Sequence, residues 1–435
     1  MAPSATSELL KTETVTAHPY KGGRLTKDYS TRANGSASRD DLKKTEFLLD
    51  CHLHRSFPVV ESGEGNYLHL TDGRTIFDAT SVIDAIVGQK NTGVPYLAST
   101  FWGSEIGEEL CKELIDGTDR KMARVYLTGS GSEAMESSIK LSRQYFYEND
   151  KQTARHFLMD NVYHVSPCNA YRQRRVGETD VAFVARKAAE LEAKFQELGP
   201  ETIIAFIAEP VVGAGLGCVP SVPGYLKVMR DVCHRHGALF ILDEQDKDVA
   251  PDLQTIGKGL GAGYQPIAAV LISQKVVDAL MNGSGQFIHG QTFQGMPVQA
   301  AAALEVRKIL REQNLMENVR AQGAYLEKRL KALLGDHPNV GDIRGRGLFW
   351  GIEFVKDKQT KEPFELHMGI AQKDHDTAIS APFNMTTYPG AGTSDGISGD
   401  HVILAPAYNI TEEDAEYTAR VICDVVQEVF QPSAN

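Results

Sequence analysis

Residues 251–266 read PDLQTIGKGLGAGYQP and set a single lysine, Lys258, among four glycines. The apolar segment at residues 253–256 predicts a short buried strand that ends just before this lysine. Glycines let the backbone take positive φ and let a ligand approach closely, which a lysine on a solvated surface does not need. Burial beside an apolar ring would lower the pKa of the amine and free it to form an imine with a carbonyl compound. A surface lysine in a glycine-rich turn is the alternative for this stretch alone.

A carboxylate follows the apolar run ALFIL at residues 238–242, which predicts a second buried strand. Asp243 would stand at the carboxyl end of that strand, where open α/β sheets bind their ligands. Asp243 and Lys258 together suit pyridoxal phosphate, because the carboxylate keeps the pyridine nitrogen protonated while the lysine holds the aldehyde. The alternative is that Asp243 serves only as a helix cap or turn former.

The segment VYLTGSGSEA at residues 125–134 predicts a strand, a Gly-Ser turn and a helix that opens near Ser132. Free backbone N–H groups at a helix start, with the positive end of the helix dipole, make an anion site that fits a phosphate. By itself this turn could simply cap a helix. Together with the lysine and the aspartate it indicates a cofactor phosphate.

The chain resembles the class III pyridoxal-phosphate-dependent aminotransferases of fold type I. The resemblance covers most of the chain from about residue 46 to the end, and its motifs stand in the order that the family has. These motifs are GSGSEA (129–134), IAEPVVGAGLGCVP (207–220), FILDE (240–244), PDLQTIGKGLGAGYQPIAAVLIS (251–273), HGQTFQGMPVQAAAALEV (289–306), RGRGLFWGIEF (344–354) and LAPAYNITEED (404–414).

The resemblance implies an α/β fold with a large domain built on a mostly parallel sheet and a smaller α+β domain. It also implies roles for five residues. Lys258 would be the imine lysine and Asp243 the partner of the ring nitrogen. Gly131 and Ser132 would bind the phosphate, and Thr292 would reach the phosphate of the neighbouring subunit's cofactor, so we expect a homodimer.

Composition excludes several kinds of partner. The 435 residues carry a net charge of −12 without a basic cluster, so we expect neither nucleic acid nor membrane as partner. No apolar run reaches the length of a membrane span. The six cysteines form no CxxC pair and no metal-ligand spacing, so we expect reduced thiols in the cytoplasm, no disulfide and no metal.

Composition and hydrophobic periodicity, together with what the resemblance implies, indicate how the chain is divided. We expect a mobile N-terminal tail at residues 1–45, an N-terminal part of the small domain at 46–80, a large cofactor-binding domain at 81–310 and the C-terminal small domain at 311–435. Predicted strands at 125–127, 155–159, 203–208 and 238–242 alternate with helices, as is typical of a parallel sheet covered by helices. The segment around Asp72-Gly73 predicts a hairpin.

Three segments beside the cofactor crevice are shorter than in the family: after strand 155–159, at residues 79–82, and at 244–251. Eight residues remain to join two strands that should be parallel neighbours, although a parallel crossover ordinarily takes a dozen or more. Gln245 replaces an expected valine, and Tyr163 matches the family's ring-stacking aromatic only by accident. We expect weak cofactor binding and low turnover.

The sequence leaves the substrate open. An arginine that holds a carboxylate in many relatives is absent before LAPAYNIT, and Ala214 stands where some relatives place its glutamate partner. Phe101 and Trp102 either line the pocket or are ordinary buried aromatics. The leading hypothesis is an aminotransferase that moves an amino group between an amine or amino acid and a 2-oxo acid. The alternatives are a lyase, decarboxylase or racemase of the same fold, and a catalytically impaired remnant.

Overall fold

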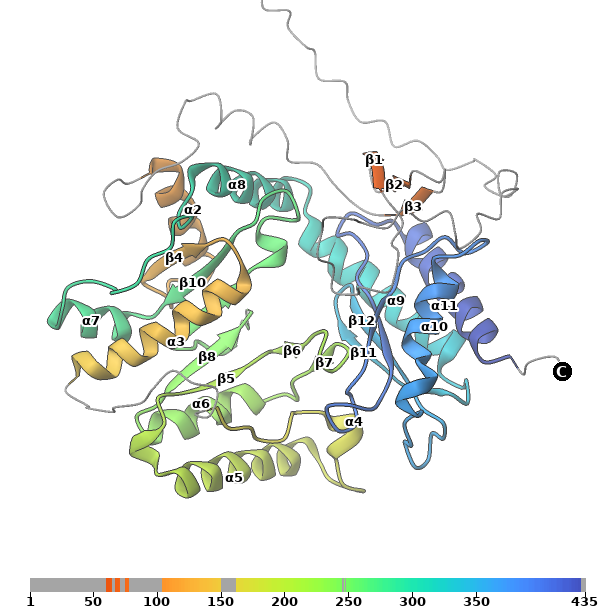
Figure 1. Cartoon of the computed structure of the whole chain (residues 1–435), viewed down its shortest axis with the longest axis horizontal. Coiled ribbons are helices and arrows are strands. Elements are labelled where there is room, and N and C mark those ends of the chain that lie inside the picture. Colours follow the sequence, from red (N-terminus) through yellow and green to blue (C-terminus); the bar gives the residue numbers. More distant parts are fainter. Residues whose placement is uncertain are drawn as a thin grey trace, which may run out of the picture. The chain divides into compact units, whose positions relative to one another are not determined.

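The computed structural model describes strands β1 (Val60–Glu64), β2 (Tyr67–Leu70) and β3 (Thr75–Phe77), and then residues 104–149, 162–244, 246 and 248–431 (Figure 1). The three first strands form an antiparallel sheet in the order β1-β2-β3, as the predicted hairpin requires. Several predictions lie outside the described residues: the N-terminal tail, the Asp72-Gly73 turn, the shortened segment at 79–82, Phe101, Trp102 and strand 155–159.

A five-stranded sheet has the order β4 (Arg124–Thr128), β10 (Ala268–Ile272), β9 (Leu253–Ile256), β8 (Leu239–Asp243) and β5 (Ala205–Ala208). Strands β5, β8 and β9 pair in parallel, whereas β10 pairs antiparallel with both β9 and β4. Because β10 reverses direction between them, β4 runs the same way as β9. The mostly parallel sheet is therefore confirmed, although the antiparallel strand β10 was not predicted.

Helices cover both faces of this sheet, because side chains along each strand alternate between two cores. Leu239 and Ile241 of β8 pack in one core with α3 (Gly131–Glu148) and α7 (Gln274–Asn282), while Phe240 and Leu242 pack in another with α5 (Asp180–Leu198) and α6 (Tyr225–Arg235). Helix α3 runs along the sheet in Figure 1. At the other end of the sheet, β10 and β4 contribute to a core with α2 (Glu105–Asp116) and α8 (Pro297–Glu312).

The C-terminal part of the chain is a smaller α+β unit, as predicted. Its sheet is antiparallel throughout, in the order β11 (Val340–Arg346), β12 (Phe349–Phe354), β14 (His401–Leu404) and β13 (Tyr388–Gly390). One core joins this sheet to α9 (Leu315–Leu334), α10 (Ile370–Ala378) and α11 (Glu412–Val429). A capping box between Thr411 and Asp414 fixes the start of α11.

The short connection from β8 to β9 joins two parallel strands without the helix that a parallel crossover ordinarily contains. The strands pair in parallel, with Ile241 beside Leu253 and Asp243 beside Thr255, and none of the described residues between them is helical. Polar side chains hold the connection instead. The buried Asp252 carboxylate accepts the Phe240 N–H at 2.8 Å, and Asp246 accepts the Val249 N–H at 3.2 Å.

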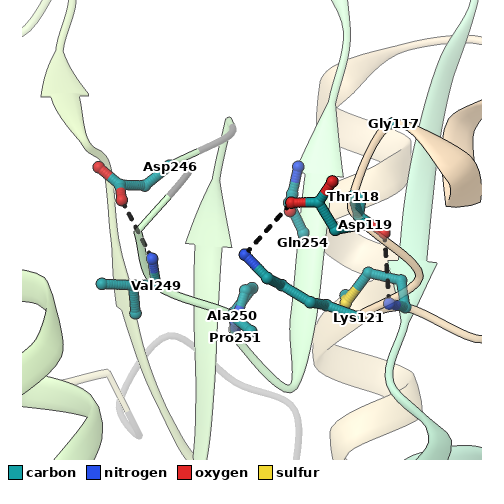
Figure 2. Close-up of a pocket in the computed structure, with 10 residues that line it drawn as sticks. Gly117, Thr118, Asp119, Lys121, Asp246, Val249, Ala250, Pro251 and Gln254 are labelled. Carbon is teal, nitrogen blue, oxygen red and sulfur yellow. Dashed lines mark hydrogen bonds and ion pairs between the residues drawn. The ribbon is translucent and has the colours of Figure 1, made fainter.

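Figure 2 shows a pocket of about 50 Å³ beside this connection. Asp246, Val249, Ala250 and Pro251 form one wall, and residues of the turn after α2 form another: Gly117, Thr118, Asp119, Lys121 and Met122. Gln254 of β9 also lines the pocket, and its buried Nε2 has no hydrogen-bond partner among the described residues. Strands β8 and β9 are parallel neighbours without a crossover helix among the described residues between them, as expected, and a turn braced by side chains joins them.

The described part of the chain contains neither a membrane-spanning helix nor a metal-binding group of side chains. No helix there combines the length and apolar character that crossing a bilayer requires. No group of three or more His, Cys, Asp and Glu side chains is arranged there to hold a metal ion.

Candidate active site

The turn between β4 and α3 is fixed by its own side chains. Ser130 caps α3, and its Oγ accepts the Glu133 N–H at 3.2 Å, while Glu133 Oε2 accepts the Gly129 N–H at 2.8 Å. Gly131 and Ser132 are exposed, and their N–H groups reach no acceptor among the described residues. First-turn N–H groups of this kind, on an 18-residue helix, form an anion site.

Lys258 stands at the start of a 3-10 turn, Lys258–Leu260, directly after β9. Its φ of +42° is in the left-handed region, which turns the chain sharply at the end of the strand. The preceding Gly257 lies against the anion turn, because a Cβ built on it would stand 3.7 Å from the Gly131 Cα. Strand end and helix start therefore meet.

A pocket of about 550 Å³ lies where the anion turn and the lysine meet. It is lined by Gly129, Ser130, Gly131, Lys258, Gly259, Ala262, Gly263, Gln265, Pro266 and Ile267. The Lys258 side chain is 90% exposed. The burial expected for this lysine is therefore not supplied by the described residues, because the 3-10 turn carries it past the end of the sheet into the open pocket.

Asp243 ends β8, as predicted, and is half-buried. Its Oδ1 accepts the Thr255 hydroxyl proton at 2.5 Å, which fixes the carboxylate against the neighbouring strand. Two further carboxylates, Glu244 and Glu209, lie within electrostatic reach of Asp243 and Lys258. Neither glutamate was predicted to be a site residue, although Glu209 lies in the motif at residues 207–220 and Glu244 in the motif at 240–244.

These carboxylates outnumber the ammonium group beside them. Burial raises the pKa of Glu244, and repulsion from Asp243 and Glu209 adds to the rise while Lys258 opposes it. Burial likewise raises the pKa of Glu209. Glu244 Oε1 lies 3.7 Å from Lys258 Nζ. A surplus of negative charge at the carboxyl ends of the strands favours a positively charged group such as a protonated pyridine ring.

Tyr408 brings the C-terminal unit to this pocket, which sequence reasoning missed. A Cβ on Gly259 would stand 3.2 Å from the Tyr408 hydroxyl, so the glycine is needed where the two segments approach. Burial, and then the nearby Glu244 charge, raise the pKa of Tyr408. The phenol therefore stays protonated and able to donate a hydrogen bond.

Thr292 does not line this pocket. It is exposed, in the turn before α8, and makes no hydrogen bond among the described residues. The structure thus brings Gly131 and Lys258 to one pocket, whereas Ser132, Asp243 and Thr292 are not among the residues that line it. The role of Thr292 toward a neighbouring subunit stays a prediction.

The arrangement fits pyridoxal phosphate by its chemistry. The unpaired N–H groups of Gly131 and Ser132 suit the phosphate, the amine of Lys258 suits the aldehyde, and the anchored carboxylate of Asp243 suits the ring nitrogen.

Comparison with known proteins agrees with this fit. The family model of the class III aminotransferases matches residues 149–426. An aminotransferase of Gibberella zeae is 44% identical over 476 aligned positions, which cover 94% of this chain and 92% of that protein. The alignment is longer than the 435 residues of this chain, so the relative has segments without a counterpart here. The vanillin aminotransferase of Capsicum annuum is 32% identical, with coverage of 83% and 90%.

Solved structures give the same result. An (S)-enantioselective omega-transaminase from Thermomicrobium roseum aligns with a TM-score of 0.80 at 26% identity and covers 89% of this chain and 97% of its own. A PMP-bound aminotransferase from Vibrio fluvialis aligns with a TM-score of 0.78 at 27% identity, covering 87% and 94%. These relatives favour amino transfer over lyase, decarboxylase or racemase activity. That the shortened segments impair turnover stays a prediction. The chain belongs to the class III aminotransferases, which transfer amino groups with pyridoxal phosphate.

Proposed function

We propose that this protein transfers an amino group from a primary amine or a non-standard amino donor to a 2-oxo acid, as a homodimer in the cytoplasm. The single observation that carries the residue roles is the shared pocket of Lys258 and Gly131. One side of this pocket offers an amine on an exposed turn, and the other offers the N-terminus of α3.

Each residue then has one task. Pyridoxal phosphate, when bound, supplies an electron sink for negative charge that develops on the reacting carbon. The N–H groups of Gly131 and Ser132 bind its phosphate. Asp243, held by Thr255, keeps a proton on the ring nitrogen. Lys258 would anchor the cofactor and, once released, its Nζ would carry the proton that the substrate carbon loses to the cofactor carbon.

The donor class rests on apolar side chains at positions where a carboxylate-binding pair would be needed. Ala214 cannot pair with an arginine, and β14 carries His401, Val402, Ile403 and Leu404, all of them buried. His401 Nε2 lies 3.1 Å from the Ala214 carbonyl oxygen, so this histidine bonds to the backbone. The names of the vanillin aminotransferase and of the omega-transaminases among the relatives are in keeping with amine chemistry.

A donor survey tests this proposal. The purified protein is loaded with pyridoxal phosphate and given a 2-oxo acid with either primary amines or α-amino acids. We expect a larger kcat/KM for primary amines, because the segment DHVILAPAYNIT at residues 400–411 has no arginine to offset the desolvation of an α-carboxylate. Activity confined to α-amino acids would contradict the donor class and leave amino transfer itself intact.

The dimer is tested by mixing two inactive variants. If Thr292 serves the neighbouring subunit, a mixed dimer of Lys258→Ala and Thr292→Ala contains one site with both residues intact. We expect cofactor affinity and activity to return on mixing, and sedimentation as a dimer. A monomer, or no recovery on mixing, would overturn the assignment of Thr292.

The cytoplasmic location follows from cysteine usage. The five cysteines in the described residues are all free thiols, and four of them are buried. Reduced thiols are typical of a reducing compartment. Fractionation of the source cells is expected to place the protein with cytosolic markers, and recovery from a secretory or organellar fraction would exclude this location.

A further inference from the structure

The loop before α8 is fastened to α3 and β4 along its whole length. Gln144 of α3 donates to the Gln286 carbonyl oxygen at 2.6 Å and accepts the Ile288 N–H at 2.9 Å. Gln291 Nε2 reaches Ser137 Oγ at 3.5 Å. The loop is therefore shaped by contacts within its own subunit.

A further contact joins Tyr126 of β4 to Gln294. The Tyr126 hydroxyl donates to Gln294 Oε1, and the same oxygen accepts the Gln291 N–H at 2.8 Å. The Tyr126 ring also packs edge-on against Phe287, with the ring centroids 5.3 Å apart, and lies 6.0 Å from the ring of His289. One tyrosine thus contacts both ends of the segment at 287–294.

Tyr126 keeps its proton throughout the physiological range. Burial, and then the neighbouring Glu133 carboxylate, raise the pKa of its hydroxyl to about 12. The hydroxyl is consequently a permanent donor to Gln294. Glu133 also accepts the Gly129 N–H of the anion turn. Tyr126 therefore lies between the subunit's own phosphate turn and the loop that carries Thr292.

The part of the loop that faces outward is exposed. Thr292 is exposed, Phe293 is 61% exposed and Ile288 is 68% exposed. The hydrogen bonds thus hold the polar glutamine side chains inward and direct Thr292 and two apolar side chains outward. Outward apolar side chains beside a free hydroxyl suit contact with another subunit.

We infer that Tyr126 and Gln294 are positioning residues whose hydrogen bond sets how residues 287–295 present Thr292 to the cofactor of the neighbouring subunit. This inference rests on the proposed role of Thr292. Neither Tyr126 nor Gln294 lines the pocket that holds Lys258, so neither is a catalytic residue. Their effect would reach the cofactor only through the loop.

The test uses Tyr126→Phe, Gln294→Ala and the double variant in the full-length protein. The control is Tyr417→Phe, which removes a hydroxyl that donates to the Phe383 carbonyl oxygen at 3.4 Å in the C-terminal unit. Two quantities are measured: the Kd for pyridoxal phosphate by visible absorbance, and amide hydrogen exchange of residues 287–295 without cofactor. Melting temperatures show whether each variant folds.

We expect each single substitution to raise the cofactor Kd about threefold to tenfold, the range that one lost hydrogen bond gives. Exchange at 287–295 should quicken, and the double variant should bind no more weakly than Gln294→Ala, because both changes break the same bond. Tyr417→Phe should change neither quantity. Gln294→Ala lies on a surface loop and keeps the test valid if Tyr126→Phe folds poorly.

Two results would overturn the inference. One is unchanged exchange at 287–295 in folded variants, and the other is an unchanged cofactor Kd in variants whose loop exchange has quickened. A separate result, equal cofactor binding by the wild type and Thr292→Ala, would refute the proposed role of Thr292. The exchange measurement needs no cofactor, so the two failures can be told apart.

Discussion

Glu353 and Glu244 are both glutamates at strands, yet their surroundings are opposite. Glu353 lies within β12 with its side chain fully buried; its Oε1 is 2.5 Å from Arg172 Nη2 and its Oε2 is 2.5 Å from Arg344 Nη1. Glu244 follows β8, its side chain is 45% exposed, and the cation that pairs with it among the described residues is Lys258, at 3.7 Å. Asp243 and Glu209 add negative charge beside it.

The difference separates a structural charge cluster from a functional one. Around Glu353 every oxygen has a guanidinium, and Arg344 also donates to the Gly217 and Leu216 carbonyl oxygens, so the cluster joins the C-terminal sheet to the turn after β6 (Val211–Val212). Around Glu244 the carboxylates of Asp243 and Glu209 outnumber the one described ammonium group, that of Lys258, which lines the pocket. An unbalanced cluster at strand ends is a site prepared for a ligand that this chain does not itself supply.

We expect the largest effect from a substitution in the balanced cluster of Glu353, Arg172 and Arg344. Arg344→Leu leaves Glu353 buried with half of its compensation, so we expect the free energy of unfolding to fall by about 3–5 kcal/mol. The control is Arg320→Leu, which removes an exposed pair with Glu317 and should cost less than about 1 kcal/mol. Urea unfolding measures both, and equal losses would show that the cluster contributes no special stability.

The second prediction concerns the short connection after Glu244. We expect the natural chain to bind pyridoxal phosphate weakly and to turn over slowly, because displacing reacting groups by about 1 Å costs roughly a hundredfold in rate. Grafting longer family segments after Ala79, Met159 and Glu244 should raise cofactor affinity, melting temperature and amino transfer. Equal rates for the natural and grafted proteins would mean that the side-chain-braced turn positions the site well enough.

A smaller effect is expected at Asp374, an unbalanced charge inside the C-terminal core. Its side chain is fully buried, one oxygen has only Thr387 at 3.4 Å, and burial raises its pKa to about 7. The folded-state pKa is above the unfolded value, so the stability that the protonated acid gives is present below about pH 4 and is lost as the pH rises through 7.

Asp374→Asn removes this titration. At pH 8 we expect the variant to be more stable than the wild type by about 1–3 kcal/mol, with a flatter profile between pH 4 and 7. Asp376→Asn, on the same helix, is the control and should keep the wild-type profile. Parallel pH profiles for wild type and Asp374→Asn would show that Asp374 does not titrate in this range.

Local patterns in the sequence were enough for the elements that carry the site. The apolar runs before Asp243 and Lys258 predicted β8 and β9, and the Gly-Ser turn predicted the start of α3. Burial of a strand and capping of a helix depend on residues that are neighbours in the sequence. These features depend on contacts close in sequence.

Features that depend on distant contacts could not be predicted in the same way. The reversed direction of β10 is set by its pairing with β4, more than a hundred residues earlier. The pair of Arg172 and Glu353 joins residues 181 positions apart. The exposure of Lys258 and the parallel pairing across a short connection depend on how Asp246 and Asp252 brace the turn. No periodicity in the sequence encodes such contacts.

The central claim is that the charged cluster around Lys258 is the cofactor site. It is tested most directly by finding which lysine holds the cofactor. The protein is incubated with pyridoxal phosphate, reduced with borohydride, digested and examined by peptide mass analysis. The account predicts a pyridoxyl group on the peptide that contains Lys258 and no label in Lys258→Ala. A label on any other lysine, with Lys258 unmodified, would contradict it.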